Sequence, residues 1–418
     1  MRTLLQNLFR NNIVKGTSFV FIGSFAANLF NYFFHLITGR MLGPEQYAIV
    51  AALLSLSYVF GFPSLIISTV ITRKIAELAA LDDKGGINGV LRLVIKFLSG
   101  FIVIFTVFLF LFQKTIAEFL NIENTSLIVI LGLSLAISYF STIGLSVLQG
   151  MLRFMSYAVV SAIGGFFKDF FALGAVLLGL GAPGVIWSFL ATSIATTATT
   201  FIPLKDILIA PVRHPTIGGK SISSTFWVAS AFFGMGLMIN TDVLVVKHFF
   251  SPYEAGLYAA LATMGKIVLF LSSSIATVLL PVATQKNARG HSTIRELALA
   301  LGVILLLSVS VIGVFALLPR LVIYLLYGEA YYPISRILWL MGVYFLFYNI
   351  SNTFIHYFIS IKRYRILMAA LVVSAVQVGL LFMFHKSFEQ IVLVLVATAL
   401  LLCLIFIYHY ISREIRKK

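Results

Sequence analysis

Four charged residues stand inside long apolar runs of this chain, where charges are costly to bury and often mark a functional pathway. Lys168 and Asp169 are adjacent in one run, Asp242 lies in a second and Lys266 in a third. A buried ammonium could bind an anionic group, whereas a buried carboxylate could bind and release a proton or another cation. We therefore expect Lys168, Lys266 and Asp242 in a substrate site, with Asp169 and Asp242 as candidates for ion coupling.

Amide side chains and one arginine extend this set. Asn349 and Asn352, together with His356, are spaced three and four residues apart and would share one helix face. Such a polar stripe in an apolar helix needs a partner, which is either a neighbouring helix or water in a cavity. The remaining candidates for the substrate site are Asn31, Asn240 and Arg40.

Structural ion pairs are the alternative interpretation of the buried charges. Asp242 or Asp169 could pair with Lys266. Asp242 and Lys266 would differ in depth by about 7 Å, at 1.5 Å per helical residue, and a lysine side chain can span much of that distance. Lys168 and Asp169 point about 100° apart on their helix, so they cannot both face one partner.

The motifs of common enzyme classes are absent. The sequence contains no GxxxxGK[ST] phosphate-binding loop and no HExxH zinc motif. Its single cysteine, Cys403, excludes an intrachain disulfide and a cysteine-based metal site. We therefore expect no catalytic residues, no metal site and no cofactor, and we do not expect an enzyme.

The composition indicates a membrane protein. Hydrophobic residues make up 60% of the 418 residues and charged residues only 11%, which is too little polar surface for a water-soluble globule. A bilayer-spanning helix needs about 20 apolar residues, and twelve such runs recur. They lie at roughly 16–39, 47–71, 90–112, 125–149, 155–179, 184–204, 226–247, 255–280, 297–319, 333–360, 366–384 and 390–411.

The basic residues predict the orientation. Of the 30 Lys and Arg residues, 22 fall on the side of the N-terminus, two lie within spans, and six fall on the opposite side. Those six are Arg40, Lys114, Lys247, Arg320, Arg336 and Lys386. Positive charge concentrates in cytoplasmic loops, so we expect a multi-pass protein of the cytoplasmic (inner) membrane with both termini in the cytoplasm. The net charge of +16 is thereby a signal of topology, and we expect no nucleic-acid partner.

A repeated motif divides the chain into halves. The stretch GPEQYAIVAALLSL begins at Gly43 and SPYEAGLYAALATM begins at Ser251, 208 residues later. Six predicted spans per half give both halves the same orientation, as in transporters built from parallel repeats. We predict a six-helix bundle at 1–205, a cytoplasmic linker at 206–222 and a second six-helix bundle at 223–418. Pro44 and Pro252 would start the second and eighth spans, since proline suits the first turn of a helix.

Two segments carry a family resemblance: GTSFVFIGSFAANLFNYFFHLITGRMLGPEQYAIVAALLSL from Gly16, and NTDVLVVKHFFSPYEAGLYAALATMGKI from Asn240. They resemble the polysaccharide transporter branch of the multidrug/oligosaccharidyl-lipid/polysaccharide (MOP) exporter superfamily, the oligosaccharide flippases. The resemblance covers the whole chain in length and in its layout of two sets of six spans. It implies an all-α membrane fold of two six-helix bundles, as in the MATE proteins of that superfamily, around a central cavity.

The resemblance also implies a function, the movement of a polyprenyl-pyrophosphate-linked oligosaccharide from the cytoplasmic to the outer leaflet by alternating access. Arg40, Lys168, Lys266 and Lys247 would then be the basic groups near the cavity that could meet the pyrophosphate. The glycan would meet amides, for which Asn31, Asn240, Asn349 and Asn352 are candidates. The partners would be the lipid-linked oligosaccharide and the lipid bilayer, with a glycan polymerase and glycosyltransferases as further partners.

Two other functions remain open. A cation-coupled multidrug exporter of the same superfamily would place Asp169 and Asp242 at its centre. A membrane scaffold for glycan synthesis, which transports nothing, would instead bury its charges in structural pairs and have a solid interior.

Overall fold

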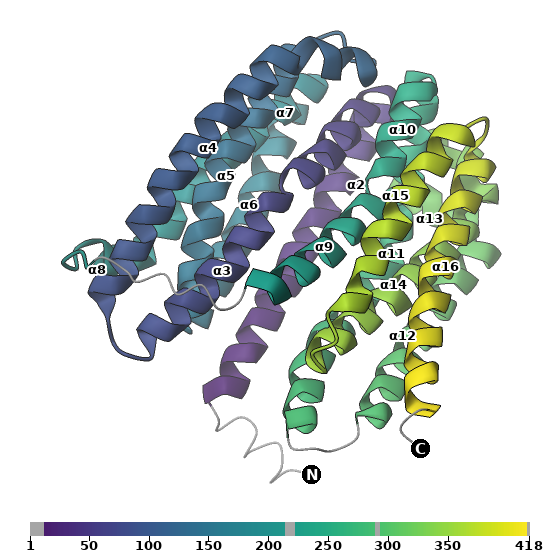
Figure 1. Ribbon diagram of the computed structural model, residues 1–418. Helices are drawn as coiled ribbons and strands as arrows, with labels where there is room; N and C mark the ends of the chain where they lie inside the picture. The colour runs from purple at the N-terminus through teal and green to yellow at the C-terminus, as the bar shows by residue number, and fades with distance from the viewer. Residues whose placement is uncertain (1–11, 214–221, 289–292, 416–418) are drawn as a thin grey trace. The chain divides into compact units, whose positions relative to one another are not determined.

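The computed structural model describes residues 12–213, 222–288 and 293–415, and the regular structure within these ranges is entirely helical (Figure 1). Eleven of the described helical stretches are long and apolar enough to cross a membrane. The first of them, Leu29–Ala80, covers most of the first two predicted spans, and each of the others coincides with one predicted span. The prediction of an all-α protein with about twelve membrane-spanning helices is thereby confirmed.

Contacts divide the chain into two compact units. Unit 1 comprises the residues up to Leu42 together with 60–220, and unit 2 comprises Gly43–Val59 together with 221–418. A short segment of the first half of the sequence therefore groups with the second half. The bundles at 1–205 and 223–418 and the linker at 206–222 stay a prediction, and residues 214–221 of that linker lie outside the described ranges.

Unit 1 is built around one central helix. Its elements are the first part of α2 (Asn12–Phe60), α3 (Phe62–Ala79), α4 (Lys84–Phe119), α5 (Ser126–Gly150), α6 (Phe154–Leu177), α7 (Gly181–Phe201), η1 (Ile202–Leu204) and α8 (Lys205–Leu208). Helix α5 packs against α3, α4, α6 and α7. Tyr139, Ile143 and Val147 of α5 join a buried cluster with residues of α3 and α4, such as Ile75 and Leu91.

Unit 2 also contains a helix that packs against several others. Its elements are α9 (Ile222–Met238), α10 (Thr241–Phe249), α11 (Pro252–Ala288), α12 (Ile294–Leu317), α13 (Pro319–Leu326), η2 (Glu329–Arg336), α14 (Leu338–Ser360), η3 (Arg365–Leu367), α15 (Met368–Met383) and α16 (Phe388–Ile415), with the second part of α2. Helix α14 packs against α11, α12 and α16, while α9 packs against α15.

The repeated motif starts a helix in both copies, as predicted. The backbone at Gly43 has φ 73° and ψ 172°, which breaks α2 immediately before Pro44. This positive φ favours glycine, because a Cβ would be strained there. Helix α11 begins at Pro252. The Ser251 hydroxyl and Glu254 carboxylate cap that helix reciprocally: Glu254 Oε2 accepts a hydrogen bond from Ser251 N at 3.1 Å, and Glu254 N donates to Ser251 Oγ at 3.4 Å.

The two copies of the motif pack against each other within unit 2. A Cβ built on Gly256 would overlap the Pro44 carbonyl group, so only glycine permits this approach of α11 to the backbone of α2. Nearby, the buried hydroxyl of Tyr47 lies 3.1 Å from Thr263 Oγ1 and 3.4 Å from the Tyr327 hydroxyl. Small and hydrogen-bonding residues at close helix contacts are typical of packing within membranes. The motif therefore forms a helix–helix joint.

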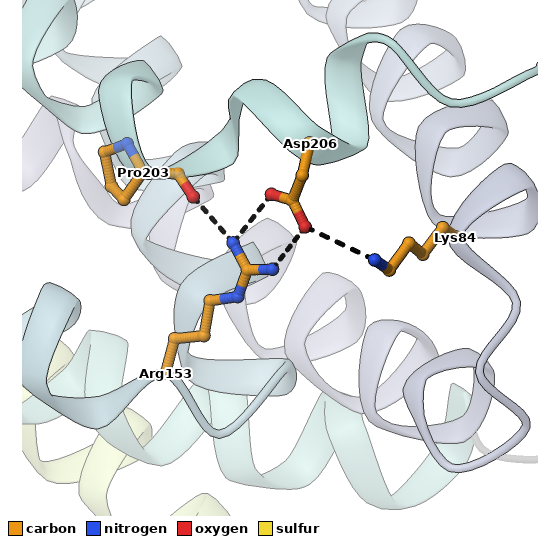
Figure 2. Close-up of polar contacts among 4 residues, drawn as sticks. All are labelled: Lys84, Arg153, Pro203 and Asp206. Atoms are coloured by element: carbon orange, nitrogen blue, oxygen red, sulfur yellow. Dashed lines mark hydrogen bonds and ion pairs between the residues drawn. The ribbon is translucent and has the colours of Figure 1, made fainter.

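The chain that follows α7 is fixed to unit 1 by a charge cluster (Figure 2). The Arg153 guanidinium donates to both carboxylate oxygens of Asp206, at 2.8 and 2.5 Å, and to the Pro203 carbonyl at 2.6 Å. Lys84 Nζ lies 3.7 Å from the same carboxylate. The hydrogen bonds to Asp206 raise the pKa of Arg153 above its ordinary value. Asn88 adds a hydrogen bond to the Ala210 carbonyl at 2.6 Å.

Removing this pair should lower stability measurably. Arg153 and Asp206 side chains are 29% and 40% exposed, and a bidentate pair of this kind contributes about 1 kcal/mol. We expect Arg153→Gln and Asp206→Asn each to lower the melting temperature in detergent by about 2–4 °C, with less than the summed effect in the double variant. Arg73→Gln is the control, because its 3.7 Å pair with Glu77 is largely exposed. Additive losses would contradict a direct interaction.

Candidate functional site

A break between α9 and α10 creates a polar cluster inside unit 2. Helix α9 ends at Met238, Asn240 leaves the helical conformation with φ −131°, and α10 begins at Thr241. A helix break frees backbone carbonyls, which must find partners where water is absent. The freed Met238 carbonyl accepts hydrogen bonds from the Tyr344 hydroxyl at 2.6 Å and from Gln377 Nε2 at 2.9 Å.

Side chains of three helices hold this break in place. Gln377 of α15 is fully buried, and its Oε1 accepts a hydrogen bond from Thr398 of α16 at 2.8 Å. Tyr348 of α14 donates to the Met235 carbonyl at 3.3 Å. Asn240 donates through Nδ2 to the Gly236 carbonyl at 2.8 Å, while its Oδ1 is buried without a partner in the described part of the chain. Specific hydrogen bonds therefore stabilise the break, and one acceptor beside it, Asn240 Oδ1, has no described partner.

Asp242 lies in the first turn of α10, beside this break. Its side chain is only 2% exposed, and a carboxylate there faces the positive end of the helix dipole. Its Oδ2 accepts a hydrogen bond from the Tyr258 hydroxyl at 2.9 Å, whereas Oδ1 is buried without a hydrogen-bond partner among the described residues. An open carboxylate oxygen at this depth is suited to bind a proton or another cation.

The ion pair between Asp242 and Lys266, the alternative interpretation of these charges, is not formed. Lys266 follows Tyr258 by two turns of α11, which is about 12 Å along the axis. Among the described residues no cationic side chain lies within 4.0 Å of the Asp242 carboxylate. The partner of the Asp242 carboxylate is therefore the Tyr258 hydroxyl and not the Lys266 ammonium.

The residues of the predicted polar stripe on α14 make different kinds of contact. Asn349 is 2% exposed and donates to the Val268 carbonyl of α11 at 3.0 Å, which supports a role in helix packing. Asn352 is half-buried, and the ring of half-buried His356 meets that of Phe232 edge-on at 5.6 Å between centroids. The stripe thus points in part to neighbouring helices.

A second polar group lies in unit 1. The Lys168 ammonium on α6 donates to Asn31 Oδ1 of α2 at 2.7 Å and lies 4.2 Å from the centroid of the Phe34 ring. In the described ranges no carboxylate oxygen lies within 4.0 Å of this ammonium. Asp169, the next residue, has a buried Oδ1 with no described partner. A cation held by an amide and an aromatic face keeps its charge available for an anionic ligand.

The structure brings together some of the predicted residues and separates others. Asn31, Lys168 and Asp169 are neighbours in unit 1, and Asn240, Asp242 and Lys266 form one region of unit 2. Arg40 is exposed and follows Asn31 by about 14 Å along α2, so it is not part of the Lys168 group. No cluster of three or more His, Cys, Asp or Glu side chains suited to a metal occurs among the described residues.

Sequence reasoning missed the residues that hold the acidic site. These are Tyr258, Tyr344, Gln377 and Thr398, with Phe34 beside Lys168. Gln377 gave a usable signal, because it is the one amide in the apolar run 366–384. The tyrosines gave none, since aromatic residues are common throughout these spans.

Solved structures share this fold at low sequence identity. An inward-facing multidrug resistance MATE family transporter of the MOP superfamily aligns with a TM-score of 0.75 and 14% identity, over 93% of this chain and 95% of that one. The outward-facing conformation of a multidrug resistance MATE family transporter of the MOP superfamily aligns with a TM-score of 0.66 and 15% identity, over 98% of both chains. A MOP superfamily transporter from Pyrococcus furiosus Vc1 aligns with a TM-score of 0.64 and 16% identity, over 96% of this chain and 97% of that one.

The sequence comparisons identify the family. None of the curated protein sequences compared with the chain matches it significantly. A family model described as polysaccharide biosynthesis protein matches residues 37–336, which is more than half of the chain. These residues include Lys168, Asp169, Asp242 and Lys266. The chain therefore belongs to the polysaccharide biosynthesis protein family and has the fold of the MOP superfamily.

Proposed function

We propose that this protein carries a polyprenyl-pyrophosphate-linked oligosaccharide from the cytoplasmic to the outer leaflet of the cytoplasmic (inner) membrane. The observation that carries the proposal is the Lys168 ammonium, which is held inside a membrane-spanning helix by the neutral partners Asn31 and Phe34. Such a cation is suited to the anionic pyrophosphate of a lipid carrier. Membership of a polysaccharide biosynthesis family supports a glycan as the cargo.

The remaining polar candidates have complementary roles in this proposal. Lys266 offers a second cation, and Arg40 is exposed at the outer end of its helix. Asn352 supplies an amide for hydroxyl groups of the glycan, and Asn240 supplies its Oδ1 as an acceptor. The amide nitrogens of Asn240 and Asn349 already donate to backbone carbonyls. Glycosyltransferases would supply the cargo and a glycan polymerase would consume it, so the protein itself catalyses no covalent step.

Alternating access would move one bundle against the other. The sequence places these bundles at 1–205 and 223–418, and residues 43–59 would move with the second, because they pack within unit 2. Both termini would lie in the cytoplasm, as the distribution of basic loops predicts. Asp242 and Asp169 each have a buried carboxylate oxygen with no described hydrogen-bond partner. Either is suited to couple the movement to an ion gradient.

Neutralising Lys168 tests the cargo assignment. In cells that depend on this protein, Lys168→Gln should reduce surface glycan and accumulate the lipid-linked precursor in the cytoplasmic leaflet. Losing a hydrogen bond to a charged group lowers the rate by a factor of about 10 to 100. Lys168→Arg should retain part of the activity, because it keeps the charge. Lys96→Gln is the matched control, as Lys96 is exposed on α4. Normal surface glycan from inserted Lys168→Gln protein would refute the assignment.

A cation-coupled multidrug exporter is the second candidate, favoured by the likeness to MATE transporters and by the buried Asp242 carboxylate. Drug resistance of cells expressing Asp242→Asn or Asp169→Asn distinguishes it. A fall in resistance, with surface glycan unchanged, would support export of drugs instead of oligosaccharide.

A further inference from the structure

A pocket on the surface of unit 2 is lined by two arginines. It has a volume of about 500 Å³ and is lined by Leu318, Arg320, Leu321, Ser335 and Arg336, among others. The pocket is open rather than enclosed. Leu318 and Arg320 stand at the junction of α12 and α13, whereas Arg336 ends η2. Residues distant by a whole loop thus line one pocket.

Both guanidinium groups are available to a ligand. Arg320 and Arg336 are exposed, and neither has a carboxylate within 4.0 Å among the described residues. Two unpaired guanidinium groups beside the Ser335 hydroxyl are suited to a phosphate, because arginine binds phosphate oxygens through its planar fork of N–H donors.

The surroundings of the pocket indicate the depth at which it lies. Helices α12 and α14 are both apolar enough to cross a membrane, and they end and begin at Leu317 and Leu338. The segment that joins them therefore lies at the surface of the bilayer. Tyr324, at 45% exposed, and Trp339, at 44%, each lie three residues after one of the two lining segments in sequence. Such residues concentrate at the level of the lipid headgroups.

The surface of α13 indicates contact with acyl chains. Leu321 and Leu325 are 50% and 58% exposed and lie four residues apart on one face, with Tyr324 beside them. Ile323 and Tyr327 are buried against the core of unit 2. A short helix with an exposed apolar face at the bilayer surface is suited to lie among lipids rather than in water.

We propose that Arg320 and Arg336 bind the phosphate headgroup of an anionic membrane lipid, whose acyl chains lie along two exposed lining residues, Leu317 at 81% and Leu321. The two guanidinium groups supply the charge and the donors, and the exposed leucines supply the apolar surface. A soluble anion would use only the first of these features. The site is independent of the proposed transport function, because it lies on the exposed surface of one unit.

Lipid binding to the purified full-length protein tests this site. Native mass spectrometry should detect phosphatidylglycerol bound to the wild-type protein and little phosphatidylcholine. A basic residue near an anionic headgroup contributes a factor of about five in affinity, so Arg320→Gln and Arg336→Gln should each weaken binding about fivefold. The double variant should bind phosphatidylglycerol no better than phosphatidylcholine. Arg320→Lys and Arg336→Lys keep the charge and lose the planar fork, so each should bind phosphatidylglycerol more weakly than wild type and more tightly than its glutamine counterpart.

Lys386→Gln is the matched control. Lys386 is exposed in the loop between α15 and α16, which is at the same membrane surface because two spans separate the loops, and its replacement should leave binding unchanged. Unchanged binding by the double variant would overturn the proposal. Inorganic pyrophosphate that displaces the lipid at equal concentration would also overturn it, since acyl chains would then add nothing. Should a glutamine variant melt earlier than wild type, the lysine variants and the Lys386 control carry the comparison.

Discussion

Gly256→Val is expected to abolish recovery of folded protein, whereas Gly302→Val should leave it nearly unchanged. A Cβ at residue 256 would overlap the Pro44 carbonyl group and lie 2.6 Å from the Pro44 Cα. The obstacle is backbone, so no rotation of a neighbouring side chain can relieve it. Overpacking typically costs about 1–3 kcal/mol even where side chains can adjust, and a backbone obstacle should exceed that range.

Size-exclusion chromatography and thermal melting of detergent-solubilised protein measure this effect. Gly302 is the matched control because it is also a helical glycine in unit 2, but no atom lies within 4 Å of its added Cβ. Both changes therefore carry the same alteration of helix propensity. We expect Gly256→Ala to fold with a lower melting temperature than Gly302→Ala. Equal melting temperatures for the two alanine variants would show that the joint between the repeated motifs tolerates extra volume.

Asp242→Asn is expected to leave the protein folded and to abolish its response to an ion gradient. Asparagine has nearly the same size, and its oxygen can still accept the Tyr258 hydrogen bond, which is 2.9 Å long in the structure. The negative charge is lost, so a coupling cation loses its partner. Interactions with a charged group are worth about 1.5–3 kcal/mol, and we expect gradient-driven transport in vesicles to fall by a factor of about 10 to 100.

Two further variants sharpen this experiment. Tyr258→Phe removes the hydroxyl and keeps the charge, so gradient dependence should persist at a reduced rate. Asp82→Asn is the matched control for the loss of an acid, because Asp82 is exposed in the turn between α3 and α4. Transport by Asp242→Asn that still responds to the gradient would exclude Asp242 as the coupling residue and leave Asp169 as the candidate.

The pattern of the sequence predicted the membrane-spanning helices and the starts of two of them. A bilayer demands about 20 consecutive apolar residues, and this demand is local, so the runs could be counted without a fold. Pro44 and Pro252 mark helix starts for an equally local reason, their fixed φ and missing N–H. The charges of Lys168 and Asp242 within membrane-spanning helices were identifiable because each interrupts an apolar run.

Their partners could not be predicted, because partners come from packing between distant parts of the chain. The sequence offered Lys266 to Asp242, yet the structure pairs Asp242 with Tyr258. Lys168 meets Asn31, which lies 137 residues earlier in the chain. In each case several polar residues lie at a similar depth along their helices. Which of them becomes the partner depends on how the helices are rotated and how closely they approach each other.

The repeated motif shows most clearly which features the sequence determines and which the tertiary structure determines. By itself the sequence determined that both copies begin a helix, since the fixed φ and missing N–H of proline act within one turn. Only the tertiary structure decided that residues 43–59 join unit 2 and that Gly256 lies against Pro44. That contact depends on the absence of a side chain at one residue and on the backbone of another 212 positions away, and no local preference encodes such a distance.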